Sequence, residues 1–294
     1  MTEILVKHIS GTLSISKSQV SNTVKLLEEG ATIPFISRYR KEASGSLDET
    51  EVTAIEKEWK RLLELFNLYN EIQNCHICPK MEPYKELRNP FAVNEKTKVF
   101  IISQALAEKQ LRFSGINFFQ LDGVLGNTGK QLEKFLNLFN QTVFPSHEIV
   151  LKNGAAIPKS NDNLLPVYNT EITQCFPGKG IKGDRKPDSL EVKNCLGRSF
   201  LLNEIKITKP KLLLLIGRLS INTFYKFIFG FEEKRSTNKI IDDIVNKSVI
   251  PEYDMNGLKI GVLPIQHASG LNPQYNVMLK NISLINLIKE FINE

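Results

Sequence analysis

The sequence predicts an α/β protein with a small all-α domain at the N-terminus and a larger three-layer α/β/α domain built on a central parallel sheet. Residues 1–73 contain only helical patterns. After residue 74, apolar runs of strand length alternate with helical patterns, which is typical of a parallel sheet covered on both faces. A chain of 294 residues is long enough for one large and one small domain. We therefore expect domains at residues 1–73 and 74–294.

Three helical segments are expected in the first domain. Residues Ser18–Glu29 place apolar side chains at helical spacing. A short element follows at residues 34–43, where proline opens the segment. Asp48 or Thr50 can cap a third helix, which runs through Trp59 and beyond.

The second domain is expected to contain four strands that alternate with four helices. The expected strands cover residues 98–103, 167–175, 211–217 and 258–265. The expected helices cover residues 129–140, 189–207, 219–229 and 274–292. In such sheets ligands bind beyond the carboxyl ends of the strands, so chemistry is expected in the loops that follow the four strands.

The charge is distributed unevenly between the two domains. The whole chain carries a formal charge of +6, with 38 basic and 32 acidic residues. Residues 1–73 hold nine basic and eleven acidic residues (−2), which leaves 29 and 21 (+8) for residues 74–294. A basic domain favours a polyanionic partner, although a solvated surface with no partner has the same composition.

Nothing in the composition predicts a membrane or secreted protein. The longest purely aliphatic run, Leu212–Ile216, is far shorter than the roughly 20 residues of a membrane helix. The N-terminus has no basic-then-apolar signal pattern, and four cysteines are too few for a disulfide scaffold. We expect a cytoplasmic, nucleoid-associated protein.

The four cysteines have the spacing of a metal site. Cys75 and Cys78 form a pair in which two thiolates can turn toward one centre, and Cys175 and Cys195 add two more soft ligands. Such a set suits either a structural zinc or an iron–sulfur cluster, which spacing alone does not separate. The alternative is that Cys175 and Cys195 are ordinary buried residues.

Taken together, these loops resemble the iron–sulfur (family 4) branch of the uracil-DNA glycosylase superfamily. The similarity covers most of residues 74–294, and its motifs occur in the family's order. In chain order they are the cysteine pair, VFIISQALA (99–107) at a GEAPG-like loop, GVLGNTG (123–129) at a glycine-rich turn, TEITQCFPG (170–178), EVKNC (191–195), and HASGLNP (267–273) at an HPS loop. All four cysteines fall on the family's ligand positions, which favours a 4Fe-4S cluster over zinc.

The resemblance implies a four-stranded uracil-DNA glycosylase fold and an enzyme of base excision repair. Such an enzyme flips a damaged or deaminated base out of DNA and hydrolyses its N-glycosidic bond. The residues with an implied catalytic role are His267, Gln104 and Asn127. The residues implied to contact the base or the DNA are Leu125, Gly126, Gly129, Glu171, Ser269, Gly270 and Leu271. The implied cluster ligands are Cys75, Cys78, Cys175 and Cys195.

Three positions depart from the family pattern. Gln104 stands where the family has an acidic residue that helps activate water, and Leu125 stands where an aromatic residue would stack on the base. Glu171 replaces the asparagine that reads the uracil edge, and an ionised glutamate offers only acceptors. We therefore expect altered base specificity or weakened activity, with Asn127 or Gln104 orienting a water.

The resemblance also implies roles for His267 and Leu271, which lie in the same loop. The His267 imidazole would hydrogen-bond the base and stabilise charge on it as it departs. Leu271 lies where related enzymes place an apolar wedge.

The first domain resembles the N-terminal helical region of the Tex family of bacterial transcription accessory proteins. The segment LLEEGATIPFISRYRKEASGSLDE (26–49) carries this similarity, which extends over roughly the first 70 residues. Arg38, Arg40 and Lys41 could contact a phosphate backbone. Surface ion pairing is the preferred interpretation, because the segment is net acidic. A protein or nucleic-acid partner is expected for this domain.

Two other functions are compatible with the sequence. One is a catalytically weak protein that binds damaged or single-stranded DNA, which the missing carboxylate at Gln104 favours. The other is a zinc-stabilised interaction protein of the transcription machinery, which the Tex-like segment favours.

Overall fold

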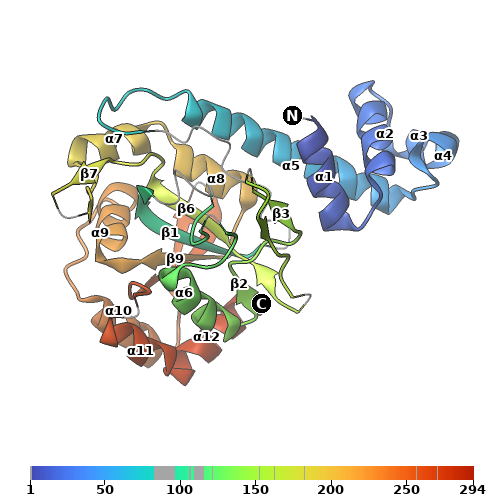
Figure 1. The fold of residues 1–294 in the computed structure, drawn as a ribbon. Helices are drawn as coiled ribbons and strands as arrows, with labels where there is room; N and C mark the ends of the chain where they lie inside the picture. Colours follow the sequence, from blue (N-terminus) through green and yellow to red (C-terminus); the bar gives the residue numbers. More distant parts are fainter. Residues whose placement is uncertain are drawn as a thin grey trace.

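The fold comes from a computed structural model and consists of a helical N-terminal part and a larger α/β part (Figure 1). The structure describes residues 2–82, 97–105, 107–108, 116–120, 122–151, 153–161, 163–181, 183–255, 257–269 and 271–294. Within these ranges no helix has the length and apolar character needed to cross a membrane.

The N-terminal part contains the three helical segments that the sequence predicts, the second of them divided into α3 and α4, and one more helix at the start. Its elements are α1 (Thr2–Leu13), α2 (Lys17–Glu28), α3 (Ile33–Tyr39), α4 (Lys41–Ser44) and α5 (Glu49–Gln73). Asp48 caps α5, because its side chain accepts a hydrogen bond from the backbone N–H of Glu51. Arg38 and Arg40 form ion pairs with Glu49 and Glu42, at 3.6 and 3.1 Å. These pairs confirm that both arginines take part in surface ion pairing.

All four predicted strands form one sheet, and they run parallel to one another. These four are β1 (Val99–Ala105), β6 (Tyr168–Thr173), β9 (Leu212–Ile216) and β11 (Leu258–Ile265), and a fifth strand, β10 (Glu252–Met255), joins the sheet at one edge. Their order is β10-β11-β9-β1-β6. The parallel four-stranded core is confirmed, whereas the antiparallel edge strand β10 was not predicted. β10 lacks a clear strand pattern because its sequence, EYDM, has only four residues, of which Glu252 and Asp254 are charged and exposed.

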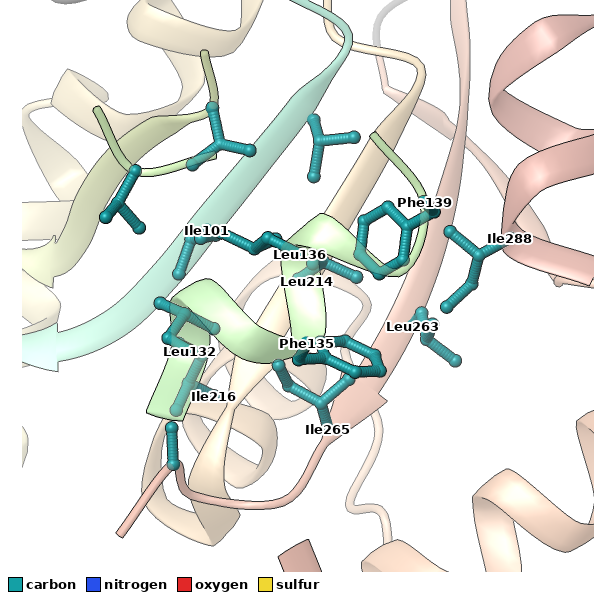
Figure 2. Close-up of a cluster of buried hydrophobic side chains, with 14 of the residues drawn as sticks. Ile101, Leu132, Phe135, Leu136, Phe139, Leu214, Ile216, Leu263, Ile265 and Ile288 are labelled. Atoms are coloured by element: carbon teal, nitrogen blue, oxygen red, sulfur yellow. The ribbon is translucent and has the colours of Figure 1, made fainter. Parts of the chain in front are cut away.

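Helices cover both faces of the sheet. One face is covered by α6 (Asn127–Asn137), α10 (Thr237–Lys247), α11 (Pro273–Leu279) and α12 (Ile282–Asn293). Figure 2 shows α6 lying across the strands, with Leu132, Phe135 and Leu136 packed on Ile101, Leu214 and Ile265. The other face is covered by α7 (Ser189–Gly197), α8 (Phe200–Thr208), α9 (Gly217–Ile228) and the end of α5. The three layers are those predicted.

In the α/β part, two of the predicted helices are each divided into two. The segment 189–207 breaks between α7 and α8, where Ser199 has a φ of 57°. The segment 274–292 breaks before α12, which Asn281 caps. Short two-residue strands lie outside the main sheet: β2 (Gln141–Thr142), β3 (Ile149–Val150), β4 (Ala156–Ile157), β5 (Leu165–Pro166), β7 (Lys179–Gly180) and β8 (Gly183–Asp184).

Helix α5 belongs to both parts of the protein. Its first half packs in the helical core through Val52, Ile55 and Trp59. Its second half enters the core of the α/β part through Leu65 and Ile72. The two parts therefore share one continuous helix, which ends at the predicted boundary.

A second contact between the two parts is made by histidine rings. His8 on α1 packs edge-on against His147, with ring centroids 4.6 Å apart. Burial, with a smaller contribution from Lys7, lowers the pKa of His147 to about 4. The His147 ring is therefore neutral at pH 7.

A buried carboxylate lies where α5, β6 and α8 meet. Glu204 on α8 has no exposed surface. Its Oε1 accepts hydrogen bonds from the hydroxyls of Tyr69 on α5 (2.9 Å) and Tyr168 on β6 (2.5 Å). Its Oε2 accepts from the Thr170 hydroxyl and from Gln174 Nε2 (3.3 Å). A buried charge is tolerated only when donors surround it in this way.

We predict that Glu204→Ala lowers the free energy of unfolding by about 3 kcal/mol or more, because several buried donors lose their acceptor. Urea unfolding measures the change. The matched control is Glu232→Ala, since Glu232 is exposed and forms a surface ion pair with Lys226. The control should stay within about 0.5 kcal/mol of the wild type. A Glu204→Ala variant as stable as the control would contradict this role.

Candidate functional site

The carboxyl ends of the four parallel strands meet at one edge of the sheet. Ala105 at the end of β1 pairs with Thr173 at the end of β6. Ile216 at the end of β9 pairs with Ile265 at the end of β11. The loops that follow these strands therefore share the edge where a ligand is expected.

His267 lies two residues beyond the end of β11 and packs against the start of α9. A Cβ atom on Gly217, the first residue of α9, would lie 3.4 Å from the Cβ and Cδ2 atoms of His267. Gly217 also has a φ of 77°, which favours glycine. The imidazole reaches solvent, but the protein around it partly desolvates the ring. This desolvation lowers its pKa below the ordinary value of 6.5.

A network of side-chain amides holds the His267 loop. Asn272, the N-cap of α11, donates from Nδ2 to the His267 carbonyl oxygen (3.2 Å) and to Gln266 Oε1 (3.4 Å). Gln266 donates to Asn238 on α10 (2.6 Å), which in turn donates to Gln274 (2.6 Å). Sequence analysis missed these residues, although an asparagine directly before Pro273 is a helix-capping pattern that identifies Asn272.

Four of the predicted residues line one surface pocket of about 730 Å³. Leu125 and Asn127 come from the glycine-rich turn, and Ser269 and Leu271 come from the loop after β11. The Ser269 hydroxyl accepts a hydrogen bond from the Leu271 backbone N–H at 3.3 Å. Leu271 is 94% exposed and Leu125 is buried. Gly270 lies outside the described residues.

Close packing explains one of the two glycines of the turn, Gly129. Gly126 precedes α6, and its N–H donates to the Phe118 carbonyl oxygen at 2.8 Å. A Cβ on Gly129 would lie 2.8 Å from Phe118 Cβ and 3.0 Å from Leu125 Cδ2. The absence of a side chain at Gly129 therefore allows the segment around Phe118 to lie against the start of α6, and the Gly126 N–H holds that segment by its hydrogen bond.

Glu171 is buried on the face of the sheet that α6 covers. It pairs in register with Ser103 of β1. Its Oε1 accepts a hydrogen bond from Asn117 Nδ2, and its backbone oxygen accepts from Gln174 at 2.7 Å. The Asn117 Oδ1 atom is buried and has no hydrogen-bond partner among the described residues. No sequence pattern identifies Asn117 as a neighbour of Glu171.

Gln104 lies on the other face of the sheet. Side chains alternate along a strand, so Gln104 points away from the face that carries Ser103 and Glu171. Its backbone oxygen accepts a hydrogen bond from the Thr173 hydroxyl at 3.0 Å. Its Oε1 atom is buried and has no partner among the described residues. The structure does not bring Gln104 together with Asn127, which lines the surface pocket.

The four cysteines line a single small cavity of about 20 Å³ together with Ile77, Met81, Gln174, Asn194 and Phe200. None of the four forms a disulfide bond. Cys195 Sγ accepts a hydrogen bond from the Gln174 N–H (3.3 Å), and Cys78 Sγ accepts one from Asn194 Nδ2 (3.6 Å). N–H donors aimed at sulfur stabilise thiolates, so the chemistry of the lining suits a group bound by cysteine. The side-chain positions do not form a complete binding site, because among the described residues no three His, Cys, Asp or Glu side chains are placed to bind one metal ion.

Comparison with known protein families identifies the larger domain. The family model of the Uracil DNA glycosylase superfamily matches residues 90–286, which is more than half of the chain. The chain belongs to the uracil-DNA glycosylase superfamily. Its parallel sheet and the edge loops described above lie within the matched range. The iron–sulfur branch of the superfamily is compatible with this result and stays a prediction.

The first domain matches a second family model, the Tex-like protein N-terminal domain, over residues 3–74. Transcriptional accessory protein Tex of Neisseria gonorrhoeae is 41% identical over 61 residues, which are 21% of this chain and 8% of that protein. Protein YhgF of Escherichia coli is 42% identical over 65 residues (22% and 8%). Uncharacterized protein YdcI of Bacillus subtilis is 27% identical over 113 residues (33% and 16%). The chain therefore spans only a small part of these relatives.

We predict that His267 titrates with a midpoint below 6.5, because partial burial disfavours the imidazolium. The chain has four histidines, so NMR spectra of the ring protons can be followed for each, with His267→Gln assigning the signal. A midpoint at or above 6.5 would show that the ring is not desolvated in solution.

Proposed function

We propose that this protein is a DNA glycosylase that flips a damaged or deaminated base into the edge of its sheet and hydrolyses the N-glycosidic bond. The proposal rests on one observation above all. Within a domain of the uracil-DNA glycosylase superfamily, the loop that carries His267, Ser269 and Leu271 lies beside the glycine-rich turn that carries Asn127. We infer that the protein acts on DNA in the cytoplasm.

His267 is suited to stabilise the departing base. A neutral imidazole can donate one hydrogen bond. A donor that is already in place before the reaction stabilises the transition state, because negative charge develops on the departing base. Asn272 and Gln266 hold the loop from behind, so the ring needs little reorganisation. Leu271, which is almost fully exposed, can fill the gap that the flipped base leaves.

Among the described residues that line the pocket, the one carboxylate is already engaged in hydrogen bonds. Glu133 lines the pocket, but its oxygens accept hydrogen bonds from the Thr142 hydroxyl (2.7 Å) and the Val143 N–H (2.9 Å). Asn127 is exposed there, and its amide can orient a water without deprotonating it. Loss of general-base help costs about a hundredfold or more in rate, so slow hydrolysis is expected.

Base specificity depends on Glu171 and Asn117. An ionised Glu171 offers acceptors only, which favours an exocyclic amine over the mixed edge of uracil. Asn117 holds one carboxylate oxygen and has an unused amide oxygen. Both groups present acceptors, so we propose a preference for a base other than uracil.

Lys130 and Lys134 on α6 line the pocket beside the base site. They are placed to contact DNA phosphates in a domain whose net charge is +8 from sequence.

Cys75, Cys78, Cys175 and Cys195 would hold a 4Fe-4S cluster, with zinc as the alternative. When bound, the group cross-links the segment after α5, the end of β6 and helix α7. Thiolate-bound iron–sulfur clusters absorb near ~400 nm, so protein purified without oxygen should be brown, and Cys175→Ser should lose the colour. A colourless protein that contains zinc would exclude the cluster.

The function is tested with an oligonucleotide panel that contains uracil, hypoxanthine, xanthine or an alkylated base in single- and double-stranded DNA. The wild type should release at least one base, and His267→Ala should slow release by about a hundredfold. If the wild type binds these oligonucleotides but releases no base, the glycosylase proposal is wrong. That result would support the second candidate function, a protein that binds damaged DNA without cutting it. The hydrogen bonds that engage Glu133, the one carboxylate among the described residues of the pocket, favour this candidate.

A further inference from the structure

A short hairpin between the third and fourth cysteines carries a fully exposed apolar side chain. Strands β7 and β8 pair Lys179 with Asp184 and Gly180 with Gly183. Ile181 follows β7 directly, at the tip, and is 103% exposed. A single exposed aliphatic residue needs no explanation by itself. The position of Ile181 in the fold and the residues around it suggest that this side chain contacts a partner.

The hairpin is tied to the edge where the candidate site lies. Lys179 Nζ forms ion pairs with Asp184 (2.9 Å) and with Glu108, which follows the end of β1. The backbone N–H of Glu108 donates to Asp184 Oδ2 at 3.2 Å. Figure 1 shows β7 on the same side of the domain as the arrowhead of β1. The hairpin is thus held against the loop after β1.

The base of the hairpin is fixed firmly. Arg185 donates two hydrogen bonds to the Glu191 carboxylate (2.8 and 2.7 Å) and one to the Pro177 carbonyl oxygen (2.8 Å). The Arg185 N–H also donates to the Gly178 oxygen at 2.8 Å. An element that is already ordered loses little conformational entropy when it binds.

Ile181 and Leu271 lie at opposite ends of the site. The hairpin follows β6 and Leu271 follows β11, and these are the two outer strands of the four parallel ones. Three strand spacings of about 4.8 Å separate the strand ends by about 14 Å. Two highly exposed aliphatic side chains therefore bracket the edge that carries His267 and the surface pocket.

The sequence around Ile181 is basic, which favours DNA as its partner. Residues 179–186 contain four basic residues and one acidic residue. Two of the four, Lys179 and Arg185, form ion pairs with Asp184, Glu108 and Glu191, so the excess positive charge comes from Lys182 and Lys186. DNA can bind both kinds of side chain in this hairpin. Its phosphates attract the basic residues, and the apolar faces of its bases can pack against Ile181. An apolar protein surface could pack against Ile181 but would leave the basic residues without an anionic partner.

We propose that the β7–β8 hairpin is a second DNA-contacting element, with Ile181 packed against the bases on the side of the site opposite Leu271. This proposal rests on the proposed function, because it assumes that DNA lies along the edge of the sheet.

The test is the affinity of the full chain for a labelled DNA duplex with a central abasic-site analogue. Ile181→Ala should weaken binding at least about fivefold, and Ile181→Leu should restore most of it, since an aliphatic side chain buries apolar surface either way. The matched control is Ile282→Ala, because Ile282 is also highly exposed (70%) but lies beyond α11. Its affinity should stay within about twofold of the wild type. All variants should melt at the wild-type temperature.

The outcomes separate this proposal from the proposed function. If the wild type binds the duplex and Ile181→Ala binds equally well, the hairpin does not contact DNA and only this proposal is wrong. A loss shared equally by Ile181→Ala and Ile282→Ala also overturns it, because the effect is then not specific to the hairpin. If the wild type does not bind DNA, the proposed function is wrong and this proposal falls with it.

Discussion

The Glu204 carboxylate has no contact with water, so the elements around it must supply its hydrogen bonds. Tyr69 supplies one from α5, and Tyr168 and Thr170 supply two from β6. Gln174 supplies another, and its own backbone N–H donates to Cys195. This one carboxylate therefore connects the helix shared with the Tex-like domain, the outer parallel strand, and the cavity that the cysteines line. Both the domain junction and the end of β6 depend on it.

Much of the fold could be predicted from the sequence, because the strands of a parallel core are continuous apolar runs. Leu212–Ile216 is such a run, and the structure buries every residue of it. The edge strand β10 could not be predicted in this way, since half-exposed polar residues give no strand pattern. The breaks at Ser199 and Asn281 were missed for a different reason. The apolar pattern continues across both positions. The helix ends there because of the backbone conformation of Ser199 and because Asn281 caps the next helix, and neither changes the apolar pattern.

The site was predictable at the level of loops but not of contacts. The carboxyl-end rule placed His267 correctly at the edge, and the structure brings Asn127, Ser269 and Leu271 to one pocket. The rule does not predict on which face of the sheet a side chain lies. The strand register shows that Ser103 pairs with Glu171, and Gln104 therefore lies on the opposite face. Asn117 and Asn238 act across long sequence separations, and no local pattern predicts such pairs. The iron–sulfur cluster and the boundary at residue 73 stay predictions.

The central proposal is that this chain keeps the scaffold of the uracil-DNA glycosylase superfamily but presents an amide, Asn127, where a carboxylate would activate water. The most direct test is the single-turnover rate at which an Asn127→Asp variant releases the base that the wild type prefers. A carboxylate at residue 127 should raise the rate about a hundredfold or more over the wild type. A folded variant that binds the same oligonucleotide but releases the base no faster than the wild type would contradict the account.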